Sequence, residues 1–207
     1  MSDAVAIAGT TTIAFDVGET LVDERRYWAT LAERAGLPPH VVWAALGSTI
    51  ALGHDHRRVW EELDVTAPSA EDVSYTAADL YPDAASTLVA IRRSGRRVVL
   101  AGNQPAAMST WAFLDALEFD AVATSEAWGV RKPERGFFDR LVELVGGEPG
   151  HIAYVGDRLD IDVAPAREAG LLAVHVRRGP WGRLQRVAAG SEPHLTVDSL
   201  DALLLHL

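Results

Sequence analysis

Thr12-Ile-Ala-Phe-Asp-Val17, followed by Gly18, is the stretch from which the fold is predicted. It is short and apolar, it contains β-branched and aromatic residues, and an acid, Asp16, lies near its end. A run of this kind with glycine after it is typical of a buried strand in a parallel sheet. Further runs of similar length follow along the chain, at residues 97–101, 120–123, 152–155 and 171–176.

Helical patterns separate these predicted strands. Residues 83–94 have apolar side chains three and four positions apart and end before Gly95, as a helix would. The same spacing follows Pro133, and residues 199–207 are predicted as a terminal helix. The alternation of strand and helix predicts an α/β fold with a doubly wound, mostly parallel, Rossmann-like sheet.

Residues 22–81 break this alternation. They show no strand pattern, while their apolar residues follow helical spacing. We therefore predict a core domain of residues 1–21 and 82–207, with a small α-helical cap of residues 22–81 inserted after the first strand. The cap would lie over the carboxyl edge of the sheet, where such folds bind ligands. Three tryptophans are expected to form the hydrophobic core of this cap: Trp28, Trp43 and Trp60.

The composition limits the possible functions. The 207 residues include 19 Lys and Arg against 29 Asp and Glu, and the formal net charge of −10 disfavours binding to nucleic acid or to an anionic membrane. The chain has no cysteine, so thiolate nucleophiles and cysteine-ligated zinc are excluded. No apolar run approaches the roughly 20 residues of a membrane span, and residues 1–12 lack the basic start of a signal peptide. We therefore expect a cytoplasmic protein.

Acidic residues follow two of the predicted strands. Asp16 ends the first strand, and Asp157 ends the fourth, with Asp162 close behind. The carboxyl ends of parallel strands lie on one edge of a sheet, so these carboxylates are expected to converge. Clustered carboxylates favour Mg²⁺ over zinc, and Lys132 would bring a positive charge to the same edge. A carboxylate nucleophile beside Mg²⁺ and lysine is suited to phosphoryl transfer.

Three motifs in this order resemble those of the haloacid dehalogenase (HAD) superfamily. The first is Phe15-Asp-Val-Gly-Glu-Thr-Leu-Val-Asp23, the next Gly129-Val-Arg-Lys-Pro133, and the last Val155-Gly-Asp-Arg-Leu-Asp-Ile-Asp-Val163. Their order and spacing resemble the family along nearly the whole chain, and the helical segment after the first strand resembles the family's small inserted cap.

This resemblance implies a role for each matching residue. Asp16 would be the nucleophile that forms an aspartyl intermediate, and Mg²⁺ would bind to Asp16, Asp157 and the backbone carbonyl of Gly18. Asp162 would support the metal or Lys132, and Lys132 would neutralise Asp16 and the transferred group. The substrate would be held by a partly overlapping set of residues: Val17, Gly18, Gly102, Asn103 and Lys132.

Two positions depart from the family's pattern. Gly18 stands where the family's phosphatases usually have a second Asp that protonates the leaving oxygen and then activates water. General acid–base help of this kind contributes roughly 10²–10⁴-fold, so its loss would slow poor leaving groups most. Gly102 stands where a Ser or Thr usually holds the transferred group, and Asn103 and Gln104 are candidate substitutes. Glu19, next to Gly18, is a candidate source of the proton, or a turn residue.

The leading functional prediction is a Mg²⁺-dependent hydrolase that acts on a small phosphorylated metabolite through an aspartyl-phosphate at Asp16. Two alternatives remain open. With Gly18 and Gly102 both atypical, the chain could be a catalytically weak phosphate-binding or regulatory protein. It could also be a 2-haloacid dehalogenase, although such members of the family tend to lack the acid at the position of Asp157.

Overall fold

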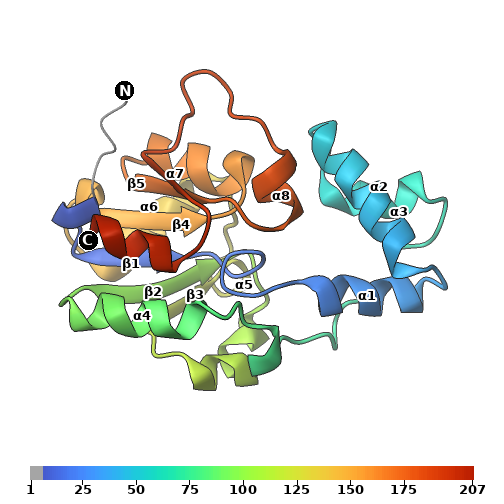
Figure 1. Ribbon diagram of the computed structural model, residues 1–207, viewed down its shortest axis with the longest axis horizontal. Coiled ribbons are helices and arrows are strands. Elements are labelled where there is room, and N and C mark those ends of the chain that lie inside the picture. Colours follow the sequence, from blue (N-terminus) through green and yellow to red (C-terminus); the bar gives the residue numbers. More distant parts are fainter. Residues whose placement is uncertain (1–6) are drawn as a thin grey trace.

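The structure, a computed structural model, describes residues 7–207, apart from the side chain of Ser109 (Figure 1). Residues 1–6 lie outside the described residues. They include the start of the predicted core segment 1–21 and part of the segment that was compared with a signal peptide.

Within residues 7–207, the sheet has six parallel strands in the order β3-β2-β1-β4-β5-β6. Their bounds are β1 Thr12–Phe15, β2 Arg97–Gly102, β3 Ala121–Thr124, β4 Ile152–Gly156, β5 Leu172–Val176 and β6 Leu195–Val197. The chain extends the sheet first on one side of β1 and then on the other, so the predicted doubly wound α/β fold is confirmed. Strand β6 has no counterpart among the predicted strands, because three residues are too few to show a pattern.

Helices cover both faces of the sheet, with α4 (Ala84–Arg93) below it in Figure 1 and α7 (Ala164–Glu168) above it. Ile13 and Phe15 of β1 belong to the hydrophobic cluster that includes α4, whereas Ala14 belongs to the cluster that includes α6 (Arg135–Val145) and α7. Successive residues of a strand point to opposite faces, so a central strand between two helical layers is apolar throughout.

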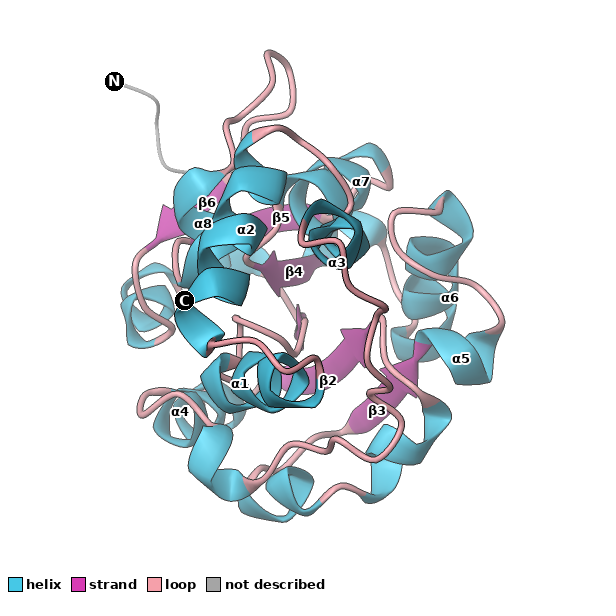
Figure 2. Cartoon of the chain, turned by 90° about the vertical axis from the view of Figure 1, so that its right-hand side faces the viewer, coloured by secondary structure: helices cyan, strands magenta, loops and turns pink. Residues whose placement is uncertain are grey.

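The segment between β1 and α4 is helical, as predicted. Its elements are α1 Arg25–Arg34, α2 Pro39–Ala51, η2 His56–Arg58, α3 Val59–Glu62 and η3 Ala77–Asp79. We call residues 22–81 the helical insertion. Figure 2, seen from the right-hand side of Figure 1, shows α1, α2 and α3 in front of the strand ends.

The helical insertion has its own hydrophobic cluster. Trp28 and Trp60 lie in it with exposed fractions of 4% and 6%, and Trp43 packs against it partly buried. One member comes from outside the insertion: Trp181 on α8 (Gly179–Leu184), 5% exposed. Both Trp60 and Trp181 lie with their ring centroids 6.3 Å from that of Trp28. Helix α8, which lies outside the insertion, therefore contributes a side chain to the insertion's hydrophobic cluster.

Two predicted helices differ from the observed ones in where they begin or in type. The helix expected from Pro133 begins at Arg135, because Glu134 is extended and separates the proline from the helix. The terminal helix is a short 3-10 helix, η8 Asp201–His206, the form that short terminal pieces often take. The other helical elements are η1 Ile7–Gly9, η4 Ala106–Thr110, η5 Ala112–Ala116, α5 Ser125–Trp128, η6 Pro149–His151 and the π-helical turn η7 Leu159–Val163. Among residues 7–207, no helix combines the length and apolarity that a membrane span requires.

Candidate active site

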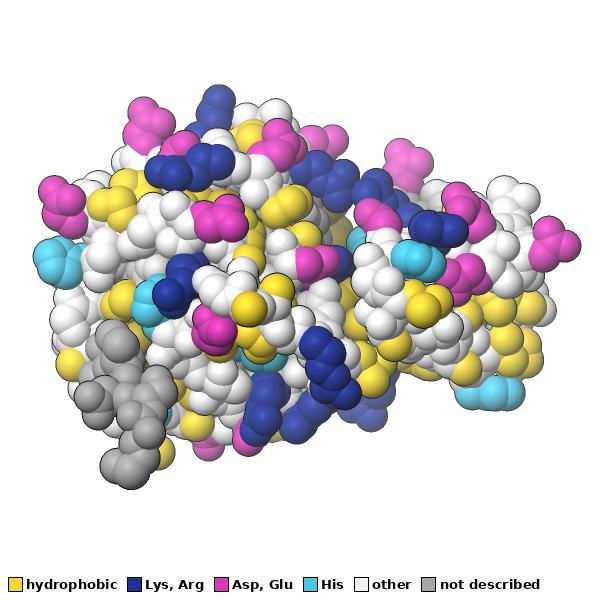
Figure 3. All heavy atoms as spheres, turned by 90° about the horizontal axis from the view of Figure 1, so that it is seen from above, with side chains coloured by type: hydrophobic (Ala, Val, Ile, Leu, Met, Phe, Trp, Pro, Cys, Tyr) yellow, Lys and Arg dark blue, Asp and Glu magenta, His cyan; other side chains and the backbone are white. Residues whose placement is uncertain are grey.

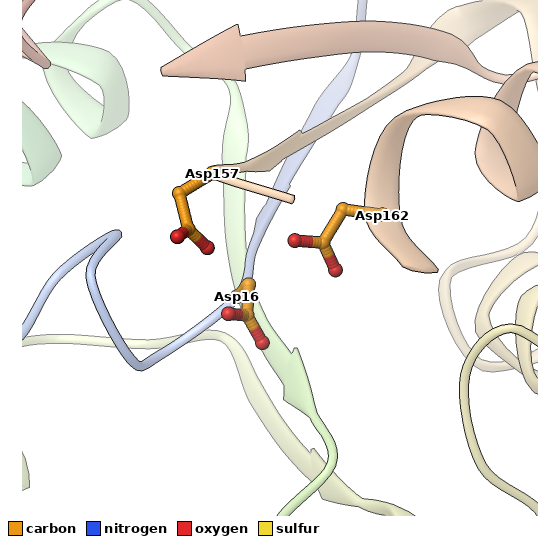
Figure 4. A group of neighbouring side chains, drawn as sticks. All are labelled: Asp16, Asp157 and Asp162. Atoms are coloured by element: carbon orange, nitrogen blue, oxygen red, sulfur yellow. The ribbon is translucent and has the colours of Figure 1, made fainter. Parts of the chain in front are cut away.

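Three carboxylates meet at the carboxyl edge of the sheet. Asp16 directly follows β1, Asp157 directly follows β4, and Asp162 lies in η7 (Figure 4). One oxygen of each lies within 4.8 Å of the others, and all three residues are buried. The predicted convergence of these acids is therefore present in the fold.

Lys132, between α5 and α6, joins two of these carboxylates. Its Nζ donates hydrogen bonds to Asp16 Oδ1 at 2.6 Å and to Asp162 Oδ1 at 2.5 Å, and the residue is 1% exposed. Burial by itself would lower the pKa of Lys132, but the two adjacent carboxylates outweigh it and hold the pKa well above its usual range. Lys132 is thus a fixed positive charge beside Asp16.

Asp157 has no such cation against its carboxylate. Its Oδ2 atom is buried and makes no hydrogen bond, an arrangement that is costly unless a further charge or proton is present. Burial raises the pKa of Asp157 well above its usual range, and Asp162 and Asp16 raise it further. An orphaned carboxylate oxygen beside two other carboxylates is a fitting donor set for a hard divalent cation such as Mg²⁺. Asp16, Asp157 and Asp162 are therefore the residues that could hold a metal ion.

The close approach of Asp162 depends on a glycine. A Cβ atom on Gly156 would lie 2.4 Å from Asp162 Cγ, so no other residue fits at the end of β4 without displacing this carboxylate. The backbone N–H of Arg158 donates to Asp162 Oδ2 at 3.1 Å. Burial raises the pKa of Asp162, and Lys132 counteracts part of that effect. Asp162 therefore accepts from Lys132 on one oxygen and from the backbone on the other.

Asn103 holds the backbone of Lys132. Its Nδ2 donates to the Lys132 carbonyl at 2.9 Å, and its Oδ1 accepts from the Lys132 N–H at 2.8 Å. The side chain is thus used to position the loop that bears the lysine. The substrate-binding role that we predicted for Asn103 stays a prediction for its backbone N–H.

Gly102 and Val17 lie next to Asp16. A Cβ atom on Gly102 would lie 3.1 Å from Asp16 Oδ1 and 3.3 Å from Val17 Cγ2, so a hydroxyl side chain there would crowd the carboxylate. Val17 is fully buried in the core, and its carbonyl accepts from the N–H groups of Leu21 and Val22 in the turn after β1. Only backbone atoms of Val17 could therefore face a substrate.

The space beside Gly18 is filled by Glu24, a residue that the sequence reasoning did not single out. A Cβ atom on Gly18 would lie 2.4 Å from Glu24 Oε1. The same oxygen accepts from the Tyr75 hydroxyl at 2.5 Å, and Trp28 Nε1 donates to Oε2 at 3.2 Å. Burial raises the pKa of Glu24, and the two neutral donors counteract part of that effect.

The Glu19 carboxyl group has hydrogen-bond partners of its own. It accepts from the Tyr81 hydroxyl at 2.5 Å and from the Glu24 N–H at 3.1 Å. A Cβ atom on Gly179 would lie 2.3 Å from Glu19 Oε2, so this carboxyl group is packed against the first residue of α8. Burial raises the pKa of Glu19 to about 7.

A cavity of about 1030 Å³ opens between the strand ends and the helical insertion. Asp16, Glu24, Lys132 and Asp157 line one part of it. Side chains of the insertion and of adjacent loops line the rest: Tyr27, Trp28, His56, Trp60, Tyr75 and Trp111 among them. In Figure 3, basic side chains lie along the junction between the insertion, on the right, and the rest of the molecule.

This fold and this set of residues agree with a known family. The model of the haloacid dehalogenase-like hydrolase family matches residues 10–170, a span that includes all three carboxylates and Lys132. The chain belongs to this family. The predicted resemblance and the hydrolase class are thereby confirmed, whereas the role of each site residue stays a prediction.

Two relatives of this HAD-like chain are named as phosphatases. A glyceraldehyde 3-phosphate phosphatase from Methanopyrus kandleri is 31% identical over 131 residues, which are 61% of this chain and 56% of that protein. A phosphoglycolate phosphatase from Mesorhizobium japonicum is 27% identical over 132 residues, with the same shares of the two chains. The chain therefore matches little more than half the length of these relatives.

Among solved structures, an L-2-haloacid dehalogenase from Xanthobacter autotrophicus superposes with a TM-score of 0.69. It is 19% identical, and the match covers 95% of this chain and 97% of that one. At this identity the likeness supports the fold and says nothing of the reaction.

Proposed function

We propose that the protein is a Mg²⁺-dependent phosphatase that acts on a small phosphate ester through an aspartyl-phosphate at Asp16. The observation that supports this most directly is the orphaned, buried oxygen of Asp157 beside Asp16 and Asp162. An attack on carbon needs no divalent cation, and a site for it would gain nothing from this unpaired carboxylate. Two relatives named as phosphatases favour the same reaction.

The chain's own residues account for the two chemical steps. A carboxylate oxygen of Asp16 attacks phosphorus, the bond to the leaving oxygen breaks, and an aspartyl-phosphate forms. Water then attacks phosphorus, the bond to Asp16 breaks, and inorganic phosphate is released. Lys132, at 2.6 Å from Asp16 Oδ1, offsets negative charge in both steps.

A divalent cation, when bound, would supply positive charge against the carboxylates and the phosphate oxygens. We expect Asp16, Asp157 and the Gly18 carbonyl to hold it, and Asp162 to keep Lys132 in place. We further propose residues 22–81 as a cap over a core of residues 1–21 and 82–207. The cap would cover the substrate and exclude bulk water during the first step.

The test is a panel of substrates assayed for both possible products. Phosphate release is measured with glyceraldehyde 3-phosphate, phosphoglycolate, a sugar phosphate and an aryl phosphate, and halide release with L-2-chloropropionate. We expect Mg²⁺-dependent phosphate release that EDTA and Asp16→Asn abolish, and no halide release. The matched control is Asp115→Asn, outside the cavity, which should leave turnover unchanged.

Two results would contradict the proposal. Halide release that depends on Asp16 would identify a dehalogenase. Mg²⁺ binding without turnover across the whole panel would favour the binding or regulatory alternative.

A further inference from the structure

The proposed reaction needs a proton donor that the predicted site residues do not provide. When the bond between phosphorus and an alkoxide breaks, the leaving oxygen must gain a proton, and the attacking water must later lose one. Asp162 forms an ion pair with the ammonium group of Lys132, which favours the ionised carboxylate, whereas a proton donor must start protonated. Asp157 belongs to the expected metal site. The remaining candidates are the other acids that line the cavity with Asp16: Glu19, Glu24, Asp55, Glu71, Glu126 and Glu134.

Glu19 and Glu24 are the two of these acids that follow Asp16 directly along the chain, and their surroundings differ. Glu19 accepts from Tyr81 and from a backbone N–H, and it packs against the position of Gly179. Glu24 instead has an oxygen 2.4 Å from where a Cβ atom of Gly18 would be. That oxygen therefore occupies the place of a side chain two positions after the nucleophile.

The contacts of Glu24 also fix its direction. Tyr75 donates to Oε1 and Trp28 to Oε2, and both donors belong to the helical insertion. Glu24 lines the same cavity as Asp16. Glu19 accepts from the Glu24 N–H at 3.1 Å, so the two residues are in contact.

We propose that Glu24 is the general acid and base of this enzyme and that it occupies the space which Gly18 leaves free. The inference rests on the proposed phosphatase reaction. In the first step the Glu24 O–H bond breaks and its proton moves to the leaving oxygen, which keeps the electron pair of the broken P–O bond. In the second step the Glu24 carboxylate takes a proton from the water that attacks phosphorus.

Glu24 also belongs to the first turn of the insertion, directly before α1. The proton donor therefore arrives with the insertion rather than with the strand end. With glycine at position 18 the Glu24 carboxyl group keeps this place, whereas a Cβ atom there would force it to move. The slow turnover of poor leaving groups that Gly18 suggested is accordingly not expected.

The test compares leaving groups in Glu24→Gln, a variant of nearly unchanged shape. We expect kcat/KM for an alkyl phosphate such as glycerol 3-phosphate to fall about 10²–10⁴-fold. For 2,4-dinitrophenyl phosphate, whose leaving group needs no proton, it should fall less than about tenfold. The slowed second step should also produce a burst of dinitrophenolate equal to the enzyme present. Glu33→Gln, an exposed change on α1, is the control for the substitution itself.

A second pair of variants tests whether the Glu24 carboxyl group and a side chain at position 18 would occupy the same space. Gly18→Asp alone should lose activity, because its Cβ atom would lie 2.4 Å from the Glu24 carboxyl group. The double variant Gly18→Asp/Glu24→Ala should regain at least about tenfold over Glu24→Ala on the alkyl phosphate, since the acid returns from the other backbone position. This pair remains informative if Glu24→Gln is poorly stable.

The outcomes separate the two proposals. If phosphate release requires Asp16 but Glu24→Gln slows both leaving groups equally and shows no burst, Glu24 is structural and only this inference fails. A double variant no better than Glu24→Ala leads to the same conclusion. If the wild-type protein releases no phosphate from any substrate, the proposed function fails and the inference fails with it.

Discussion

At the scale of single residues, the site places three buried carboxylates around one lysine. Lys132 pairs with Asp16 and Asp162, whereas Asp157 Oδ2 is buried without a hydrogen bond from any described residue. The apo protein thus contains an excess of buried negative charge, and this excess is unfavourable unless a cation or a proton compensates it.

Asp157→Asn tests for this excess of buried negative charge without any activity assay. In the absence of metal we expect the variant to be more stable than the wild type at neutral pH, because one buried charge is removed. Saturating Mg²⁺, at about 100 times its Kd, should stabilise the wild type by about 2.7 kcal/mol and the variant far less. Thermal unfolding with and without Mg²⁺ measures both effects. Equal shifts in the two proteins would place the metal elsewhere.

Asn103→Ala tests the positioning of Lys132. The change removes two hydrogen bonds to the lysine backbone, so we expect a loss of about 1–3 kcal/mol in the free energy of unfolding. Because the lysine would sit less firmly beside Asp16, kcat should fall more than KM rises. Urea unfolding and steady-state kinetics measure the two effects. A rise in KM with unchanged kcat would instead indicate a direct contact between the Asn103 side chain and the substrate.

At the scale of elements, η2 of the insertion meets the loop after β4. His56 Nδ1 lies 3.3 Å from Arg158 Nη1, and its ring packs edge-on against Trp28 and Trp181. Burial and, to a smaller extent, the Arg158 guanidinium together lower the pKa of His56 to about 4. This contact therefore requires the neutral imidazole.

The pH dependence of stability follows from that requirement. Between pH 4 and 6.5 the unfolded chain binds a proton at His56 that the folded chain does not. Proton binding therefore favours the unfolded chain, and the free energy of unfolding falls as the pH falls through this range. We expect the free energy of unfolding to decrease less steeply over this range in His56→Gln than in the wild type. Urea unfolding at a series of pH values measures the two slopes. Parallel curves would show that His56 is readily protonated in the folded protein.

At the scale of the whole molecule, Trp181 joins the sheet domain to the insertion. It lies on α8, after β5, yet it belongs to the insertion's hydrophobic cluster. Helix α8 also lies beside α2 (Figure 1), and Leu184 Cδ1 would contact a Cβ atom on Gly47 at 3.6 Å. The helical insertion is thus contacted from two sides, by the chain that enters it and by α8.

Trp181→Ala should therefore weaken the packing of the helical insertion as well as destabilise the fold. We expect a loss of about 3–5 kcal/mol, as for other buried large-to-small changes, and faster proteolysis within residues 22–81. Val187→Ala, just after α8 and 46% exposed, should cost less than about 1 kcal/mol and serves as the control. Urea unfolding and limited proteolysis provide the measurements. Comparable losses in the two variants would mean that Trp181 is not the main contact.

Much of this arrangement is predictable from local sequence pattern. Each apolar run from 12 to 176 forms a strand, and the acids at the ends of β1 and β4 lie together because parallel strands share a carboxyl edge. The pattern does not predict the short strand β6 or the residue at which α6 begins. Three residues contain too little pattern, and a proline marks a boundary only to within a few positions.

Local periodicity and strand-end acids thus specify the fold class, the helical insertion and the set Asp16, Lys132, Asp157 and Asp162. The tertiary structure alone decides that Glu24 fills the space beside Gly18 and that Asn103 holds Lys132. Their directions are set by partners 51 and 29 positions away, Tyr75 and Lys132. Spacing along the chain gives no information about such contacts, because they arise only when the insertion and the sheet pack together.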